Sequence, residues 1–360
     1  MKVLYAIQGT GNGHISRANE IIPILERRVS LDVLVSGKNS TLKLNYPVKY
    51  NFNGISFAFG KKGGIDFWKS LVNLNPIQFI RDIRSLNVND YDLIISDFEP
   101  ISAWACKLYG KECVGLSNQF AMISPETPKL SNYNFLLRLF LKYFCPVSIG
   151  YGIHYQSLGK KIFSPIIKKR LLKIRPEKLS HYTVYLPSYS VKKITQKLKG
   201  IKNINFHVLT KEVSRSKTDR NFIFKPISQN LFTKSISTCE GVICNAGFET
   251  TSEAIYLKKK LLVIPMKNQF EQKYNAFCLK KMGYESIKKL DSKKISKWIK
   301  SGNQILVDFD QETRDIVDRI LIDYIKRLPR IPILPKLKTC LLYTSPRPRD
   351  VEEYRMPSYA

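Results

Sequence analysis

Acidic residues are scarce in this sequence, which has 29 Asp and Glu against 59 Lys and Arg and a net charge of +30. The excess is concentrated in residues 101–200, with 17 basic and 3 acidic residues, and residues 129–178 hold 11 basic residues against Glu177 alone. A field of this sign favours an anionic partner, such as a membrane surface, a nucleic acid or a phosphorylated substrate. No nucleic-acid-binding motif or aromatic platform accompanies it, so we expect no nucleic acid among the partners.

Long apolar runs are missing too. No stretch approaches the roughly 18 uninterrupted apolar residues that span a bilayer. Met1 leads directly into the strand-like KVLYAI, without the basic region, apolar core and cleavage site of a signal peptide. These absences predict a cytoplasmic protein.

Metal-ligand patterns are a third absence. The seven cysteines form no CxxC or Cys/His cluster, so we expect buried free thiols and no metal site. Of the four histidines, His154, His181 and His207 stand in no readable motif. We expect those three to be structural.

What the sequence does contain is the alternation of strand and helix signals that is typical of parallel sheets with crossover helices. With 360 residues, 44% of them hydrophobic, the chain is long enough for two α/β domains. In the first half we expect strands at 2–7, 31–37, 48–59, 92–100 and 112–118, and helices at 16–28, 67–86 and 102–110. In the second half we expect strands at 182–188, 204–210 and 260–266, a strand entering a turn at 237–247, and helices at 191–199, 248–258, 271–282 and 311–327.

Residues 128–178 fit this rhythm poorly, because they are basic, aromatic and interrupted by prolines. We interpret them as the end of the first domain plus a linker. The prediction is an α/β fold with two Rossmann-like, doubly wound parallel-sheet domains facing across a cleft, at residues 1–178 and 179–328. A tail covers residues 329–360. From about Cys340 it resembles a translated sequencing adapter, and we exclude it from fold reasoning as non-native.

The clearest local signal is an apolar strand that runs into the turn at 245–247 and then into a helix. Free N–H groups and the positive dipole end of that helix form a cradle for a diphosphate, and Gly247 lets the backbone approach it closely. Thr250 and Thr251 either cap the helix or donate to phosphate oxygens. Glu253, one turn into the helix, is placed to accept hydrogen bonds from ribose hydroxyls.

A strand–glycine–helix junction also occurs in many α/β folds without a ligand, but here a second feature follows it. After the strand LLVIPM comes a polar loop at the carboxyl edge of the predicted sheet, where open α/β folds bind their ligands. The predicted donor-binding residues are therefore Gly247, Phe248, Thr250, Thr251, Glu253, Gln269, Glu271 and Gln272.

Gly247, Glu253, Pro265, Glu271-Gln272 and Asn275-Ala276 stand in an order that resembles the GT-B glycosyltransferases, close to the lipid II synthase group (glycosyltransferase family 28) and related bacterial and archaeal glycosyltransferases. The resemblance covers roughly residues 1–327 and is strongest over 241–283. It implies transfer of a sugar, with inversion and without metal or cofactor, from a nucleoside-diphosphate donor, here UDP, to a hydroxyl acceptor. It also implies that Glu253 holds the ribose, that Glu271 and Gln272 hold the transferred sugar, and that Asn275 fixes the loop.

The first strand ends in GTGNGH, and its loop residues Gly9, Gly11, Asn12 and Gly13 are predicted to line the cleft. The glycines are each two residues apart, so the G-x-G-x-x-G spacing of dinucleotide-binding folds is not met. The second strand also ends without the acidic residue that a nicotinamide site requires, which excludes that cofactor.

By the same resemblance, the loop histidine of related sugar transferases acts as general base, oriented by an aspartate at the end of a later strand. His14 and Asp97 are the corresponding pair here; the alternative is that His14 shapes the loop or contacts phosphate. Proton removal from the acceptor hydroxyl contributes on the order of 100- to 10,000-fold in rate. Glu99, Asn118 and Gln119 are candidates for contacting acceptor hydroxyls.

The stretch NYNFLLRLFLKYFCP at 132–146, with the basic run 160–178, is a candidate interfacial segment. It predicts an enzyme peripheral on the inner face of an anionic membrane, with a lipid-linked acceptor; the alternative is apolar side chains in the core and solvated lysines. Two other functions share the fold: a nucleotide-sugar 2-epimerase, and a catalytically silent protein that binds an anionic surface.

Overall fold

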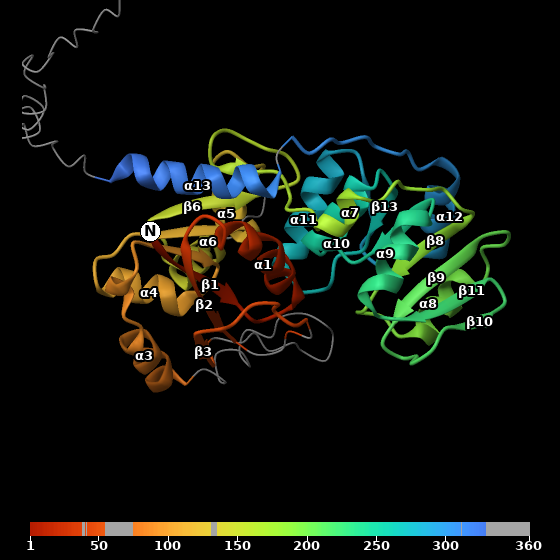
Figure 1. Ribbon diagram of the computed structural model, residues 1–360. Coiled ribbons are helices and arrows are strands. Elements are labelled where there is room, and N and C mark those ends of the chain that lie inside the picture. The colour runs from red at the N-terminus through yellow and green to blue at the C-terminus, as the bar shows by residue number, and fades with distance from the viewer. Residues whose placement is uncertain (38–39, 41, 55–74, 131–134, 311, 329–360) are drawn as a thin grey trace, which may run out of the picture. The chain divides into compact units, whose positions relative to one another are not determined.

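The computed structural model describes residues 1–37, 40, 42–54, 75–130, 135–310 and 312–328. Residue contacts divide the chain into two compact units, 1–320 and 321–360, and both β-sheets lie in the first of them. Within the described residues each sheet has seven strands, and Figure 1 labels most of the strands and helices.

The first sheet has the strand order β3-β2-β1-β4-β5-β6-β7, and its pairings are parallel throughout. Its strands are β1 (Lys2–Gln8), β2 (Ser30–Ser36), β3 (Tyr50–Phe52), β4 (Leu93–Asp97), β5 (Cys113–Ser117), β6 (Ile149–Ile153) and β7 (Ile162–Phe163). The central strands β1 and β4 are almost entirely buried, as expected for strands with both faces covered. The connecting helices are α1 (Asn12–Leu25), α3 (Pro76–Ser85), α4 (Pro100–Leu108), α5 (Asn118–Ile123), α6 (Phe135–Phe144) and α7 (Lys169–Leu172).

The second sheet has the order β10-β11-β9-β8-β12-β13-β14 and is parallel except at its edge, where β10 is antiparallel to β11. Its strands are β8 (His181–Tyr185), β9 (Asn205–Thr210), β10 (Lys217–Asp219), β11 (Phe222–Pro226), β12 (Gly241–Cys244), β13 (Lys260–Val263) and β14 (Glu285–Ser286). Its helices are α8 (Val191–Leu198), α9 (Gln229–Thr238), α10 (Phe248–Tyr256), α11 (Phe270–Lys281) and α12 (Ser292–Ser301), with α13 (Thr313–Arg327) following.

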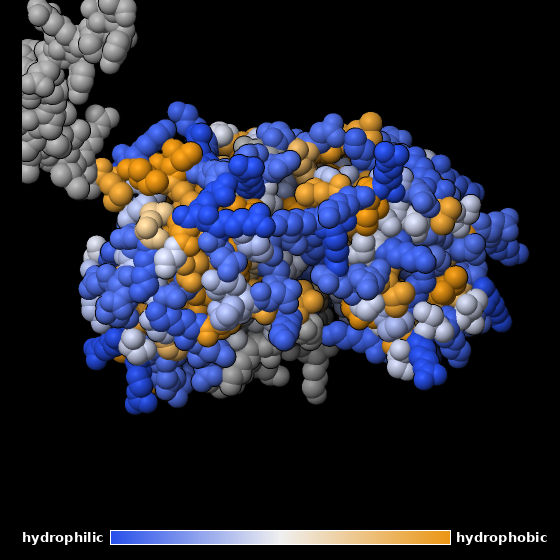
Figure 2. Space-filling model, viewed as in Figure 1, coloured by the Kyte–Doolittle hydropathy of each residue, from blue (hydrophilic) through white to orange (hydrophobic). Residues whose placement is uncertain are grey.

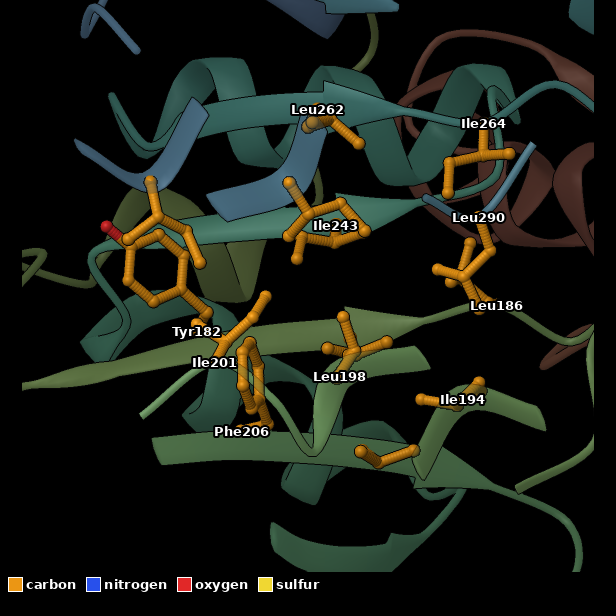
Figure 3. Packing of buried hydrophobic residues seen from close by; sticks show 14 of the residues in the cluster. Tyr182, Leu186, Ile194, Leu198, Ile201, Phe206, Ile243, Leu262, Ile264 and Leu290 are labelled. Atoms are coloured by element: carbon orange, nitrogen blue, oxygen red, sulfur yellow. The ribbon is translucent and has the colours of Figure 1, made fainter. Parts of the chain in front are cut away.

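Buried side chains from strands and helices form the core of the second sheet. Tyr182, Phe206 and Ile243 lie on its strands and are fully or almost fully buried, as is Leu198 of α8 (Figure 3). Burial of this apolar surface holds α8 and α12 on the sheet and so fixes the strand ends from which the polar loops start.

Several sequence-based predictions differ from the structure. Helix α1 begins at Asn12 and not at residue 16, because Gly11, at a φ of +90°, ends the loop and starts the helix. The irregular segment 128–178 continues the first sheet, since it contains β6 and β7 as well as α6 and α7. The predicted helix at 67–86 is seen as α3, and its residues up to 74 lie outside the described part of the chain.

The predicted domain boundary at residue 178 lies between β7 of the first sheet and β8 of the second. The boundary itself stays a prediction, and the tail from residue 329 lies outside the described residues. Within the described ranges, no helix combines the length and the apolar character needed to cross a membrane. Figure 2 shows a face that is mainly hydrophilic, in keeping with the many Lys and Arg residues.

Candidate functional site

The carboxyl end of β1 is packed against the end of β2. The N–H of Gly9 donates to the Ser36 carbonyl at 2.6 Å. A Cβ added at Gly9 would lie 2.7 Å from the carbonyl oxygen of Gly37. Only glycine allows this approach, and it directs the loop into α1 above the sheet edge.

His14 lies in the first turn of α1, and its Nδ1 is 2.8 Å from Oδ1 of Asp97 at the end of β4. Asp97 is fully buried and the His14 side chain is 12% exposed. An ionised carboxylate only accepts hydrogen bonds, so this contact assigns the proton to Nδ1 and leaves Nε2 as the acceptor. The structure thus brings together the two residues of the predicted pair.

Arg17, one helical turn after His14, is a member of this cluster that the sequence analysis missed. Its Nε and Nη2 donate to the two carboxylate oxygens of Asp97 at 3.0 and 2.7 Å. Burial would raise the pKa of the Asp97 carboxyl, but the charges of Arg17 and His14 outweigh it and hold that pKa below its usual value. Asp97 is therefore an ionised partner shared by two cationic or cation-forming groups. The spacing from His14 to Arg17 places both on one helix face, which is the sequence signal that was available.

Arg17 also connects the first sheet's loop to the second sheet's helix. Its Nη1 donates to Glu249 Oε1 at 2.9 Å, and Glu249 lies in the first turn of α10. Burial raises the pKa of Glu249 to about 7, with Arg17 and Lys168 opposing the shift. A carboxyl that titrates near neutrality therefore lies at the start of the predicted diphosphate-binding helix.

The start of α10 is open above Gly247. Gly247 is the N-cap residue, no side chain caps the helix there, and a Cβ added to it would meet nothing within 4 Å. Asn275 Nδ2 donates to the Ala246 carbonyl at 3.0 Å and so fixes the turn. Thr250 lines the cavity beside Gly247. The Thr251 hydroxyl, in contrast, is buried and bonds Tyr155 Oη and the Gly247 carbonyl at 2.7 and 2.9 Å.

Glu253 lines the cavity and forms an ion pair with Lys168. Arg170 lines the same cavity, and its buried Nε has no hydrogen-bond partner within the described residues. Both cations come from the segment whose lysines the sequence analysis assigned to a membrane or to solvent. Here they line the same cavity as the start of α10 and add positive charge to it.

Glu271, at the start of α11, accepts hydrogen bonds from Asn118 Nδ2 at 2.8 Å and Gln119 Nε2 at 3.4 Å. Two residues that were predicted to contact the acceptor substrate thus bond a residue that was predicted to bind the nucleotide-sugar donor. Gln269 lines the same cavity. Gln272 is directed elsewhere, since its Oε1 accepts from the Met266 backbone N–H at 2.9 Å and the residue does not line the cavity.

Glu99 does not reach the cavity. It is fully buried and caps α4 by accepting from the backbone N–H groups of Ile101 and Ser102 at 2.8 and 2.7 Å. Burial raises the pKa of its carboxyl, opposed by hydrogen bonds from Ser36 and Ser102. The structure gives it the role of a helix cap in place of the predicted acceptor contact.

Residues from both sheets' loops and helices line one cavity of about 730 Å³, a size within the usual range of small-molecule sites. Its lining includes Gly11, Asn12, Gly13 and His14 from the first sheet's loop, and Gly247, Phe248, Thr250, Glu253, Gln269 and Glu271 from the second half. Tyr185 and Phe232, whose rings meet edge to face with centroids 5.2 Å apart, line it too and had no sequence signal. In the described part of the chain, no group of three or more His, Cys, Asp or Glu residues is arranged to hold a metal ion. The six cysteines described are buried free thiols, as expected.

The sequence profile described as "Glycosyl transferase family 1" matches residues 1–301. The chain is a glycosyltransferase of the GT-B fold class and belongs to this family. The match does not extend to the lipid II synthase group, so that finer kinship stays a prediction. No curated protein matches the sequence.

Solved structures support the fold assignment. Arabidopsis thaliana UGT89C1 complexed with UDP-L-rhamnose matches with a TM-score of 0.55 at 12% identity. The match covers 90% of this chain and 94% of the UGT89C1 chain. Phytolacca americana UGT2, complexed with UDP-2fluoro-glucose and pterostilbene, gives 0.56 at 12%, covering 95% and 97%. CalG4, the calicheamicin glycosyltransferase, gives 0.53 at 10%, covering 96% and 99%. At such identities the likeness establishes the fold alone.

Proposed function

We propose that this glycosyltransferase transfers a sugar, with inversion, from a UDP-sugar to a hydroxyl acceptor in the 730 Å³ cavity. The observation that carries the proposal is that His14, held by the buried Asp97, lines the same cavity as the uncapped start of α10. A base and an anion-binding helix end are the two parts that such a transfer requires.

The donor's diphosphate would lie at the N-terminus of α10, above Gly247 and beside Thr250. Lys168 and Arg170 add positive charge there, which stabilises the diphosphate as it leaves. The ribose would bond Glu253, which also pairs with Lys168. The uracil ring of the donor would pack against Tyr185 and Phe232. The transferred sugar would bond Glu271, whose carboxylate Asn118 and Gln119 already orient.

In the reaction, the acceptor oxygen attacks the anomeric carbon while His14 Nε2 takes the hydroxyl proton. The bond from the anomeric carbon to the diphosphate oxygen breaks, and its electron pair leaves with UDP. Asp97 holds His14 in the tautomer that presents Nε2 and stabilises the imidazolium that forms.

The acceptor is proposed to be lipid-linked, at the surface of an anionic membrane. The support is the exposed basic residues of the segment 129–178, which include Arg138, Lys142, Lys160 and Lys161. Liposome sedimentation with and without anionic lipid tests this. Binding that does not change with lipid charge would exclude the electrostatic version.

A thermal-shift panel with UDP-, GDP-, dTDP- and CMP-sugars tests the donor assignment. We expect the UDP-sugars to raise Tm and Glu271→Ala to remove most of the sugar-dependent part of that shift. A panel without any stabilising donor, or an unchanged donor profile for Glu271→Ala, would contradict the proposed site.

A further inference from the structure

A second cavity, of about 1060 Å³, lies in the half of the molecule that carries the first sheet. Part of its lining is apolar and comes from α5, α6 and the loop before β6: Phe120, Ile123, Tyr143, Pro146 and Val147. It shares no lining residue with the first cavity. Helix α5 contributes to both linings: its Asn118 and Gln119 line the first cavity, and its Phe120 and Ile123 line the second.

The rest of the second cavity's lining is strongly basic. Six of its residues are cationic, namely Lys107, Lys111, Arg138, Lys142, Lys160 and Lys161, against the single carboxylate of Glu126. Arg138 and Lys142 are four residues apart on α6, so these like charges are neighbours on one helix face. Lys107 lies in the last turn of α4, and Lys111 follows that helix. Within the described residues, none of the six belongs to an ion pair.

Glu126 carries one negative charge and can offset only one of the six positive charges. Its carboxylate is packed against the chain at Gly159, where an added Cβ would lie 2.5 Å from Oε1. Five of the six cations are exposed and Lys111 is half-buried, and like charges gathered around one cavity repel one another. An anion in the cavity would relieve that repulsion, and the neighbouring apolar wall would bury a hydrocarbon chain.

We propose that the second cavity binds a phosphorylated lipid, with the phosphate among the basic residues and the first part of the chain on the apolar wall. A free phosphate or sugar phosphate would use only the basic half of the lining. A neutral lipid would use only the apolar half. The combination of both halves in one cavity points to an amphiphile with an anionic head. This site is separate from the proposed transfer site and does not depend on it.

Isothermal titration with alkyl phosphates tests the proposal, using concentrations at which they are monomeric. We expect dodecyl phosphate to bind at least tenfold more tightly than inorganic phosphate and than dodecyl maltoside. Butyl phosphate should bind with intermediate affinity, because each methylene that becomes buried adds up to about fourfold. Equal binding of inorganic and dodecyl phosphate would indicate a free-phosphate site and overturn the proposal.

Exposed lysines and arginines provide the matched variants. The triple variant Arg138→Gln, Lys142→Gln, Lys161→Gln should bind dodecyl phosphate roughly tenfold or more weakly. The control triple Lys192→Gln, Lys199→Gln, Lys202→Gln removes the same charge from exposed positions around α8 and should bind like the unchanged protein. An equal loss in both triples would mean that only net charge matters. Both triples should keep the UDP-sugar thermal shift, which separates failure of this proposal from failure of the transferase proposal.

Discussion

Asp97 serves His14 and Arg17 at once, beside a longer hydrogen bond of 3.4 Å from Tyr5 Oη, and this sharing determines how the cluster around His14 works. The carboxylate accepts from His14 and from two nitrogens of Arg17. Arg17 keeps Asp97 ionised, so that it can orient His14, but it also withdraws negative charge from the histidine. Arg17 Nη2 also lies 3.1 Å from His14 Nδ1, so both nitrogens approach Oδ1 of Asp97.

Replacing His14 tests the proposed base. His14→Ala should lower kcat on the order of 100- to 10,000-fold and leave the UDP-sugar thermal shift nearly unchanged, because the donor contacts lie on α10 and α11. Steady-state kinetics with saturating donor measures the effect. Near-normal turnover would remove the base assignment and leave only the loop-shaping alternative.

Glu249 should make donor binding depend on pH. Its pKa of about 7 means that it is largely protonated at pH 6 and largely ionised at pH 8. The ionised form repels a diphosphate at the start of α10, so donor affinity should rise as pH falls from 8 to 6, by roughly threefold to tenfold. Titration of a UDP-sugar, which has no ionisation in this range, measures it. Glu249→Gln should abolish the dependence, and a dependence that survives would assign it to another group.

At the scale of elements, α1 and α10 supply residues to the cavity from the two sheets, and each helix begins at a glycine that follows a strand. The two glycine-rich junctions nevertheless serve different purposes. Gly9 is required by the close approach of β1 and β2, whereas Gly247 leaves space for a ligand. Substitutions at these two positions should therefore fail in different ways.

Gly247→Val should fold but not bind donor. Its φ of −73° suits any residue and an added Cβ meets nothing within 4 Å, so the free energy of unfolding should change by no more than about 1 kcal/mol. The valine methyl groups would fill the space above the helix start. Chemical denaturation and the UDP-sugar thermal shift measure the two effects, and a retained thermal shift would place the diphosphate elsewhere.

Gly9→Ala should destabilise the protein instead. The new Cβ would overlap the Gly37 carbonyl oxygen at 2.7 Å, and such overpacking costs about 1–3 kcal/mol. Chemical denaturation measures the loss. An unchanged free energy of unfolding would show that the β1–β2 junction tolerates a shift that this packing does not suggest.

At the scale of the whole molecule, buried histidines make stability depend on pH. Burial lowers the pKa of His154 to about 4, and burial together with His181 and Lys225 lowers that of His207 to about 3. The His207 ring stacks on His181, whose pKa is also lowered by burial, at a centroid distance of 3.7 Å. The native state therefore keeps these rings neutral at pH values where the unfolded chain protonates them.

The free energy of unfolding should fall as pH decreases from 7 to 5. Below an unfolded pKa of about 6.5 the unfolded state binds more protons than the native state, so each such histidine costs on the order of 1 kcal/mol by pH 5. Urea denaturation at several pH values measures the slope. His207→Gln should reduce the slope. A slope of the opposite sign would mean that carboxyls with a raised native pKa, such as Glu249, dominate this range, because they bind protons in the native state first.

Periodicity and junction chemistry predicted most of this fold. Buried runs such as KVLYAI and the turn at Gly247 gave the strands, the helix α10 and the parallel-sheet class, because apolar periodicity and glycine turns are local properties. The strands β6 and β7 escaped prediction, since their segment is basic and proline-rich. It forms strands because β6 pairs with β5 and β7 pairs with β6, and not by its own pattern.

By itself, the sequence determined the two-sheet α/β class, the predicted pair of His14 and Asp97, and a polar loop at Glu271. Only the tertiary structure decided which polar groups share a cavity. Arg17 and Glu249 are 232 residues apart and meet through folding alone, and Lys168 leaves solvent to pair with Glu253. The same packing withdrew Glu99 into the cap of α4 and the Thr251 hydroxyl into bonds with Tyr155 and the Gly247 carbonyl, because a buried polar side chain needs a hydrogen-bond partner.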